Sequence, residues 1–412
     1  MHRDRLALEK LALELGVQTI PESWKANWEA YEEWLGADCD LPSWQIQPNA
    51  QKAFDLPEES LSDLESIYAA IRADECLRQL ADFWHYLIYH LPAGMERNTN
   101  VWNLPDAMLG CSTRAFSLAA MISGPEHARQ NFAATGVSDQ VIYDTLGYIG
   151  RYARDIRAKR GVWGLESLGW LSTYVRANIF RLGRLTFKSG TMGQPFRAYK
   201  NRRSGEVAVL CDGGRYRQDG LADGTNDTFD PNPWTPTVEV TETTVSGHPI
   251  SCEASALSDT VELRTDEWEQ AMGPGDDIVE VHVAGGSRLS AEECADSYRQ
   301  ALNFFPGYYP NARFTGFTIW SWLLDPSLAK ILPPESNIVQ FQRDFHQLPV
   351  SANEAQAYDL VFGDSKADPT TFACKTSIQQ AIADYVRAGG KLRSTGGIIT
   401  WSEAREIAKR AM

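Results

Sequence analysis

The chain has 412 residues, 43% hydrophobic and 23% charged, which is typical of a soluble globular protein with two or three domains. Asp and Glu number 54 against 39 Lys and Arg, and the formal net charge of −15 argues against general nucleic-acid binding, which needs clustered cations. No apolar run reaches the roughly 18 residues of a membrane span, and the charged N-terminus is no secretion signal. We expect a cytoplasmic protein with no nucleic-acid and no membrane partner. Basic residues cluster between Arg151 and Arg217, as either an anion site or a solvated surface.

Cysteine and histidine show no pattern of a disulfide framework or of metal ligands. The seven cysteines occur singly, without a CxxC pair, so we expect reduced thiols. None of the seven histidines has metal-ligand spacing, and His85 and His90 are expected on different faces of one helix. We therefore predict no metal site.

Residues 1–160 are predicted to form a helical domain. Apolar residues recur at three- and four-residue spacing in the segments 59–91 and 138–161, and Ser138 is a suitable N-cap for the second. The segment 164–183 continues this pattern. One face of that segment carries apolar residues that we interpret as core: Leu165, Leu168, Leu171, Val175 and Ile179.

The rest of the chain is predicted to form a second domain, 161–350, and a helical C-terminal extension, 351–412. Segments rich in Val, Thr and aromatic residues, separated by Gly and Asn/Asp turns, predict antiparallel strands. The segment 260–272 is predicted to be a strand leading into a short helix, and Gly396 and Gly397 are expected in the last loop. The fold class is therefore α+β or α/β, with a mostly helical N-terminal domain followed by a mixed sheet with flanking helices.

Two strands and a helix stand at the centre of the second domain. Strands are predicted at 277–283 and 313–324, with a helix at 291–305 between them. A strand–helix–strand unit of this length predicts two neighbouring parallel strands. Residues 325–332 are predicted to form a short helix, and 338–345 fits either a helix or a strand.

The first of these strands alternates in character. Val279, Val281 and Val283 point to one face, which we expect to pack on the core, and Glu280 and His282 point to the other. That second face meets either solvent or a cleft. In a cleft, a Glu and a His side by side could move protons, because His titrates near neutrality.

A glycine turn joins this strand to the helix. Gly285 and Gly286 allow a tight turn, and Ser290 is a good N-cap that Glu293 completes as a capping box. The free N–H groups and the positive dipole end of the helix suit a pyrophosphate. Glu292 and Glu293 partly satisfy the same helix end, so the pattern is weak by itself.

Several strings of this sequence resemble one family. VEVHVAGGSRLSAEECADS, FTIWSWLLDPSLAKILPPESNIVQFQRDFHQLPV and TSIQQAIADYVRAGGKLR resemble the GNAT-like acyltransferases of actinobacteria and clostridia. GWLSTYVRANIFRLGRLTF is similar to the segment that opens their catalytic domain. The specific strings lie between Gly169 and Arg393. Upstream of Gly169 the resemblance rests on a similar pattern of predicted helices. The resemblance implies a bacterial enzyme with a helical N-acyltransferase N-terminal domain and a GNAT-like C-terminal domain.

The resemblance implies acyl-CoA as co-substrate. In GNAT folds the thioester lies where the fourth and fifth strands splay apart, which would be 277–283 and 313–324 here, and the helix between them presents its N-terminus to the CoA pyrophosphate. The residues then expected to bind acyl-CoA are Val283, Gly285, Gly286, Ser287, Arg288, Ser336 and Asn337.

The same resemblance implies transfer of the acyl group to a primary amine on a small molecule or peptide. Glu280 or His282, directly or through water, would deprotonate the amine, and N–H groups of the splayed strand would hold the oxyanion. Ser321 is the third candidate catalytic residue. The candidate substrate-binding residues are Trp320, Trp322, Arg176 and Arg184.

Two alternatives stay open. The tyrosine that often protonates the thiolate in GNAT enzymes has no clear counterpart, since Phe341 and Phe345 stand in its segment and Tyr308 and Tyr309 precede the fifth strand. One alternative is therefore a catalytically inactive protein that binds a small ligand or peptide. The other is a hydrolase with a serine nucleophile, for which the sequence offers no GxSxG elbow.

Overall fold

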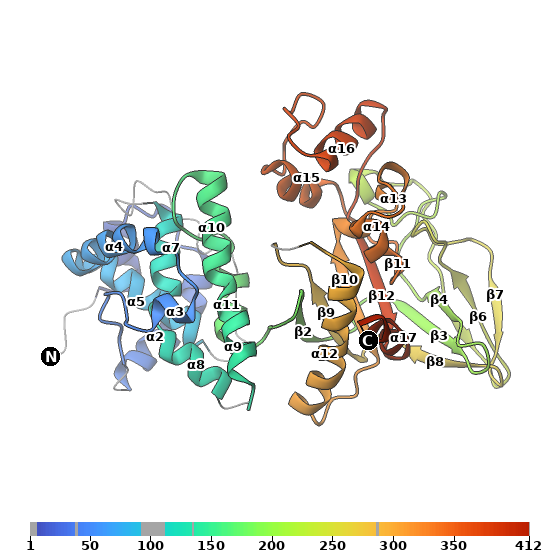
Figure 1. Ribbon diagram of the computed structural model, residues 1–412, viewed down its shortest axis with the longest axis horizontal. Coiled ribbons are helices and arrows are strands. Elements are labelled where there is room, and N and C mark those ends of the chain that lie inside the picture. Colours follow the sequence, from blue (N-terminus) through green and yellow to red (C-terminus); the bar gives the residue numbers. More distant parts are fainter. Residues whose placement is uncertain (1–5, 38–39, 92–111, 134–135, 286–287, 412) are drawn as a thin grey trace. The chain divides into compact units, whose positions relative to one another are not determined.

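The computed structural model describes residues 6–37, 40–91, 112–133, 136–285 and 288–411 (Figure 1). The chain forms two compact units, Met1–Arg181 and Leu182–Met412. The division therefore falls after Arg181, not after residue 160, and the segment 351–412 belongs to the second unit. Among the described residues, no helix is both long enough and apolar enough to cross a bilayer.

The first unit is helical, as predicted. Its described α-helices are α1 (Leu8–Glu14), α2 (Glu22–Gly36), α3 (Ala50–Ala53), α4 (Leu61–Ala73), α5 (Glu75–Tyr89), α7 (Thr113–Met121), α8 (Pro125–Ala133), α9 (Asp139–Leu146), α10 (Tyr148–Arg160) and α11 (Leu168–Val175). The segment 59–91 divides at Asp74, whose extended backbone interrupts the helix and whose carboxylate accepts a hydrogen bond from the Leu77 N–H at 2.9 Å. This N-cap starts α5 anew.

Two long helical segments are shorter than predicted. The segment 138–161 divides at Gly147, and Gly161 ends α10 in the left-handed region at φ 76°. The predicted helix over 164–183 ends after Val175, and Ile179 lies outside it. Ile179 is nevertheless fully buried, so the apolar pattern correctly predicted burial even where it did not predict the backbone.

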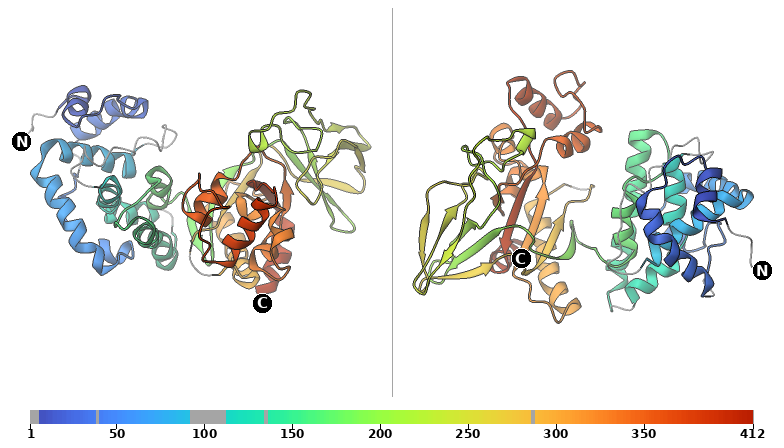
Figure 2. Two further views of the ribbon diagram at one scale, coloured as in Figure 1. Left: turned by 90° about the horizontal axis from the view of Figure 1, so that it is seen from above. Right: turned by 180° about the vertical axis from the view of Figure 1, so that it is seen from behind.

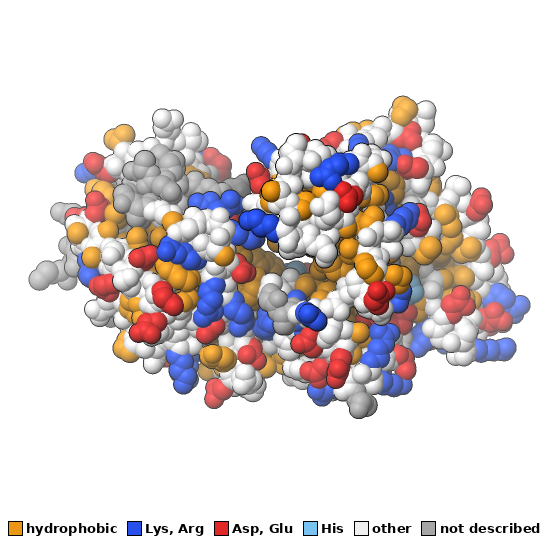
Figure 3. Space-filling model, turned by 45° about the horizontal axis from the view of Figure 1, so that its top comes forward, with side chains coloured by type: hydrophobic (Ala, Val, Ile, Leu, Met, Phe, Trp, Pro, Cys, Tyr) orange, Lys and Arg blue, Asp and Glu red, His pale blue; other side chains and the backbone are white. Residues whose placement is uncertain are grey.

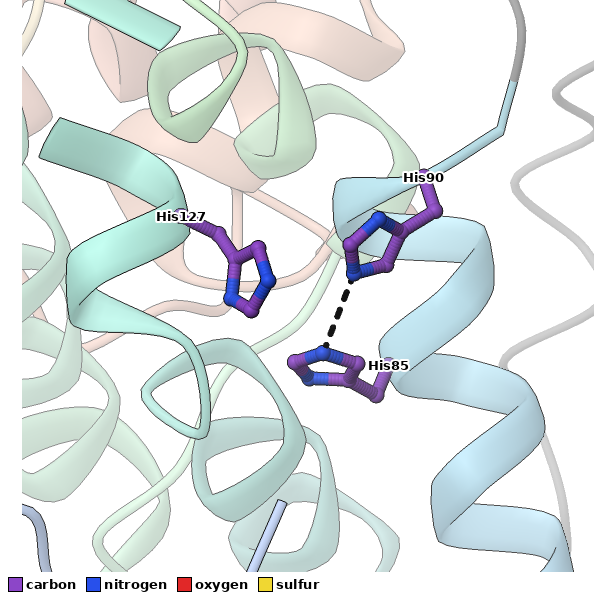
Figure 4. Close-up of side chains that lie close together, drawn as sticks. All are labelled: His85, His90 and His127. Carbon is purple, nitrogen blue, oxygen red and sulfur yellow. Dashed lines mark hydrogen bonds between the residues drawn. The ribbon is translucent and has the colours of Figure 1, made fainter. Parts of the chain in front are cut away.

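His85 and His90 lie together, contrary to the expectation from helical spacing. α5 ends at Tyr89, so His90 is its C-cap and no longer follows the helical rotation. The two Nε2 atoms are 3.3 Å apart, and His127 of α8 lies beside both rings (Figure 4). Burial lowers the pKa of His85 well below its ordinary value, and burial with the nearby His127 lowers that of His90 to about 4. Burial also lowers the pKa of His127.

The second unit contains a mixed six-stranded sheet. Its strand order is β1 (Phe180–Leu182), β2 (Leu185–Thr191), β9 (Asp277–His282), β10 (Gly316–Ser321), β12 (Thr395–Thr400) and β11 (His346–Leu348). β9 and β10 pair in parallel, as the strand–helix–strand pattern predicted, and the other interior pairs are antiparallel.

A second, antiparallel sheet packs on one face of the first (Figure 2). Its strands are β5 (Glu239–Val240), β6 (Thr244–Pro249), β4 (Val207–Cys211), β3 (Phe196–Asn201) and β8 (Trp268–Met272), with β7 (Val261–Arg264) paired to β6. The core between the sheets includes Phe196, Met272, Ile278 and Ile398. The helix predicted within 260–272 is wrong, because Trp268–Met272 pairs with β3 and this pairing overrides local propensity.

Helices cover the opposite face of the first sheet. They are α12 (Ala291–Tyr308) and α17 (Trp401–Ala408). The helices α13 (Leu328–Ile331), α14 (Asn337–Gln342), α15 (Ala355–Phe362) and α16 (Ser377–Arg387) lie toward one end of the strands, with α15 and α16 beyond it (Figure 1). Phe317 of β10 lies between Tyr298 of α12 and Trp401 of α17, with ring centroids 5.3 Å from each. The ambiguous segment 338–345 is helical through Gln342.

The predicted last loop is the strand β12, which lies inside the sheet between β10 and β11. Gly396 and Gly397 are in this strand because side chains occupy the space above them. A Cβ at Gly396 would lie 1.9 Å from the Trp320 ring, and one at Gly397 would lie 2.4 Å from Leu324. Glycine in a strand often marks such a close approach.

Candidate active site

β9 and β10 separate part-way along their length. The parallel ladder joins Ile278 to Gly316 and continues to the pair of Glu280 and Thr318. The last two residues of β9, Val281 and His282, have no partner in β10, although β2 still pairs with them on the other side. The main-chain groups on the β10 side of this strand end therefore lie outside the β9–β10 ladder.

The two faces of β9 differ as predicted. Val279 and Val281 are buried, whereas Glu280 and His282 are partly exposed on the other face. Val283 follows the strand and is only half-buried. The polar pair therefore lies on the sheet face opposite α12, at the end where β9 leaves β10.

Lys188 of β2 joins this pair. It lies directly opposite Glu280 in the β2–β9 register, and its Nζ is 3.1 Å and 3.3 Å from the two carboxylate oxygens. His282 Nε2 lies 3.4 Å from Glu280 Oε2. A Cβ at Gly190 would lie 2.5 Å from Glu280 Oε1, so this glycine leaves room for the carboxylate.

Lys188 and His282 keep Glu280 ionised. Burial by itself would raise the pKa of the Glu280 carboxyl, but the interactions with His282 and Lys188 outweigh it and hold the pKa below its ordinary value. A carboxylate held in this way is a weak base. It is better suited to orient an imidazole and to stabilise its protonated form.

Arg184 braces the loop that follows β9. Its Nη1 donates to the Ala284 carbonyl at 2.9 Å, and its Nε donates to the Arg288 carbonyl at 3.2 Å. The Arg184 N–H donates to Ser297 Oγ of α12 at 2.8 Å. This arginine, predicted to bind substrate, is buried and lies instead at both ends of the candidate pyrophosphate loop.

The N-terminus of α12 has the predicted Ser290 cap, but Glu293 does not complete the predicted capping box, because its carboxylate bonds the Ser290 hydroxyl and not the Ser290 N–H. Ser290 Oγ accepts a hydrogen bond from the Glu293 N–H at 3.2 Å and donates to the Glu293 carboxylate at 2.7 Å. Gly285 and Arg288 are exposed at the two sides of the loop, and the predicted ligands Gly286 and Ser287 lie outside the described residues.

The residues after β10 mostly have structural contacts. Ser321 Oγ accepts from the Leu323 N–H at 3.1 Å and caps the short helix Trp322–Leu324. Trp322 is buried, whereas Trp320 is 40% exposed over Gly396. Of the two tryptophans predicted to bind substrate, Trp320 is therefore exposed and Trp322 is part of the core.

The remaining predicted site residues, Ser336, Asn337 and Arg176, lie in elements other than β9 and β10. Ser336 Oγ caps α14 by accepting from the Val339 N–H at 3.3 Å, and Asn337 is the first residue of that helix. Arg176, in the first unit, donates from Nε to the Ile88 carbonyl at 2.6 Å and from Nη2 to the Leu87 carbonyl, so it caps the C-terminal end of α5.

α14 contains no tyrosine that could protonate the thiolate. Phe341 and Phe345 pack on each other with ring centroids 5.0 Å apart. Tyr308 and Tyr309 lie at the C-terminal end of α12, and a helix of this length separates its ends by about 27 Å at 1.5 Å per residue. They are therefore remote from the loop before α12.

A large cleft lies at the β11 edge of the sheet, away from the diverging strands. Its volume is about 720 Å³, and its walls come from β4, the end of β6, α13, α14 and β11. On the face of the second unit in Figure 3, acidic and basic side chains are interspersed. That face offers no broad basic surface to a nucleic acid.

Comparison with known families decides the classification. Residues 179–399, more than half of the chain, match the GNAT-like C-terminal domain, and residues 48–177 match the N-acyltransferase N-terminal domain. This chain belongs to the GNAT-like acyltransferases. The family and the fold class predicted from the sequence are thus confirmed. No curated protein matches this acyltransferase.

Three solved structures share the fold of this acyltransferase. An acyltransferase in complex with decanoyl-CoA is 19% identical with a TM-score of 0.61, covering 96% of this chain and 99% of the other. An acyltransferase in complex with decanoyl-CoA and teicoplanin, and one in complex with CoA and 10C-teicoplanin, are each 18% identical. Both have TM-scores of 0.64 and cover 96% of this chain and 100% of theirs.

The site of this acyltransferase contains one residue that the sequence analysis missed. Lys188 is separated from Glu280 by more than ninety positions, and only the β2–β9 register brings them together. The signal in the sequence was the alternation of apolar and polar residues from Leu185 to Lys188. That alternation predicts a polar face but cannot identify the strand opposite.

Proposed function

We propose that this acyltransferase moves an acyl group from a CoA thioester to the primary amine of a small molecule. The observation that carries the proposal is the separation of β9 from β10 beside Glu280 and His282. It places the point where the β9–β10 ladder stops beside a carboxylate and an imidazole, which are the groups that can position and deprotonate an amine. The solved structures of the same fold that hold decanoyl-CoA or CoA support the choice of donor.

His282 is the general base in this proposal, and Glu280 is the positioning residue. Glu280 is already engaged by Lys188, and its lowered pKa makes it a poor proton acceptor. His282 turns Nε2 toward the Glu280 carboxylate at 3.4 Å, so this carboxylate orients the imidazole that we propose to accept the proton. The carboxylate then stabilises the imidazolium, as an acidic partner does in hydrolase triads.

The transfer step balances as follows. The amine lone pair forms the new C–N bond to the thioester carbonyl carbon, and His282 takes one N–H proton. The carbonyl oxygen becomes an oxyanion held by N–H groups of the separated part of β9. The C–S bond then breaks, and sulfur leaves with the bonding pair and receives one proton from the imidazolium or from water. No tyrosine is needed for this proton.

The loop braced by Arg184 is the proposed seat of the CoA pyrophosphate. It leads into the N-terminus of α12, where free N–H groups favour an anion. Arg288 is exposed there and adds a positive charge. Arg184 donates to the carbonyls of Ala284 and Arg288, which flank the loop.

A small-molecule acceptor and a medium-length acyl chain are the first substrates to test. One solved structure of this fold holds teicoplanin together with decanoyl-CoA. We therefore propose decanoyl-CoA as the first donor and a panel of primary amines, with teicoplanin among them, as acceptors.

Calorimetric titration with decanoyl-CoA, followed by a CoA-release assay across the amines, tests the proposal. We expect saturable binding and amine-dependent release. His282→Gln should lower kcat by about 100-fold or more with unchanged decanoyl-CoA affinity, since general-base catalysis contributes about 10²–10⁴-fold. Glu280→Gln should lower kcat less.

A matched control is His248→Gln, which changes a histidine of the second sheet and should leave kcat unchanged. If the protein binds decanoyl-CoA but transfers to no amine, the inactive binding protein is the better description. Failure to bind any acyl-CoA would refute the donor assignment, and full activity in His282→Gln would remove the base.

A further inference from the structure

A cluster of three histidines lies in the first unit, outside the site described above. His85 is in α5, His90 is its C-cap, and His127 is in α8 (Figure 4). One ligating atom of each lies within 4.8 Å of the others. We propose that His85, His90 and His127 form a binding site for a divalent transition-metal cation of the Zn²⁺ class.

The hydrogen bonds of Ser123 set the tautomer of His85. Ser123 Oγ donates its single proton to the Ala120 carbonyl at 2.7 Å. The contact of 2.7 Å between His85 Nδ1 and Ser123 Oγ must then be donated by the imidazole. Nδ1 carries the proton, so Nε2 presents a lone pair toward His90. Histidines that ligate metals usually have such a partner on the far nitrogen.

The distance between the two nearest nitrogens suits a shared cation. His85 Nε2 and His90 Nε2 are 3.3 Å apart. Two ligands on tetrahedral zinc, with Zn–N near 2.0–2.1 Å, lie about 3.3–3.4 Å apart. The His127 ring stands nearly perpendicular to that of His90 with centroids 4.6 Å apart, and one of its nitrogens lies within 4.8 Å of a nitrogen of each of the other two rings.

The surroundings leave a fourth position. His85 and His127 line a cavity of about 320 Å³ that Asp40 and Glu126 also line. These carboxylates favour a cation, whereas Arg176, close enough to His90 to affect its charge, opposes one. Arg176 already donates to the carbonyls of Leu87 and Ile88 at the end of α5. Three neutral imidazoles with an open position are the ligand set of several zinc sites.

The packing around the cluster fixes two of its rings. Trp34 stacks on His90 with centroids 4.7 Å apart, and Tyr89 lies against His85 at 4.9 Å. A Cβ at Gly124 would lie 2.9 Å from Tyr89 and 3.0 Å from His85, so this glycine allows the approach. Ordered rings lose little conformational freedom when they bind a metal, which favours affinity.

The test uses the full chain without a histidine tag. Binding of ZnCl₂ is measured by calorimetry, and binding of CoCl₂ is measured by visible absorption. We expect about one equivalent bound and cobalt bands of a nitrogen-ligated, low-coordinate site. His90→Gln and His127→Gln should each weaken binding by about 100-fold or more. Ser123→Ala should weaken it by about 10-fold, because it removes the hydrogen-bond partner that orients the His85 ring. His248→Gln should bind like the wild type.

Zinc should also raise the melting temperature of the wild type but not of His90→Gln, because a ligand stabilises only the state that binds it. Circular dichroism of each variant confirms that it is folded. The absence of saturable one-to-one binding in the wild type would overturn the proposal. So would binding that survives in the His90→Gln/His127→Gln double variant. Neither result bears on acyl transfer, which uses the other unit.

Discussion

At the scale of single residues, the site depends on how one carboxylate is held. Glu280 lies between a lysine from β2 and a histidine from its own strand, and together they overcome the cost of its burial. Lys188 has two opposite effects on the proposed mechanism. It weakens Glu280 as a base, and it keeps a negative charge in place for the imidazole that we propose to be the base.

Lys188→Met tests this balance through the pH dependence of stability. A carboxyl whose folded-state pKa is lowered stabilises the native state above its unfolded pKa, about 4.3, and loses that contribution as pH falls through the folded pKa. Removing Lys188 should therefore lower the free energy of unfolding by about 1 kcal/mol at pH 7, as expected for a partly exposed pair, and by less at pH 4.

Urea unfolding at the two pH values measures the difference. An equal loss at pH 7 and pH 4 for Lys188→Met would show that the lysine acts through packing rather than through charge.

At the scale of elements, the strand β12 shows how packing selects glycine. Gly396 of β12 lies against the Trp320 ring of β10 and Gly397 lies against Leu324, while β12 pairs with β10 inside the sheet. The strand contains no room for a methyl group at Gly397, where Leu324 and Phe345 both lie close.

Gly397→Ala should destabilise the protein by about 1–3 kcal/mol, the usual cost of overpacking a core. Gly193→Ala is the matched control, because a Cβ there meets no atom within 4 Å and should be neutral or slightly stabilising. Chemical denaturation compares the two. Equal stabilities would mean that Leu324 and Phe345 move aside at little cost.

At the scale of the whole molecule, the chain has two units with separate cores. Such chains commonly depart from two-state unfolding, because each unit has its own balance of burial and entropy. Each unit also offers a glycine where a methyl group cannot fit. In the first unit, a Cβ at Gly150 would lie 2.1 Å from the Asp55 carbonyl oxygen.

Scanning calorimetry should therefore resolve two transitions. Gly150→Ala should lower one of them and Gly397→Ala the other, each by about 2–4 °C per kcal/mol for units of this size. If either substitution shifts both transitions together, the two units unfold as one cooperative body.

The sequence by itself determined what depends on short-range pattern. The alternation of Val279 and Val281 predicted the buried face of β9, Ser290 predicted the start of α12, and the spacing of apolar residues predicted the helical first unit. These features follow from backbone geometry and local hydrogen bonds, which neighbouring residues control.

Only the tertiary structure decided which distant residues meet. Strand register brings Lys188 to Glu280, and a hydrogen bond to the Ala284 carbonyl places Arg184 at the loop before α12. Helix packing brings His127 beside His85 and His90. A sequence pattern states which face a side chain occupies, but the partner across that face depends on long-range pairing. For this reason the helical spacing of His85 and His90 predicted no metal site, whereas the fold gathers three imidazoles.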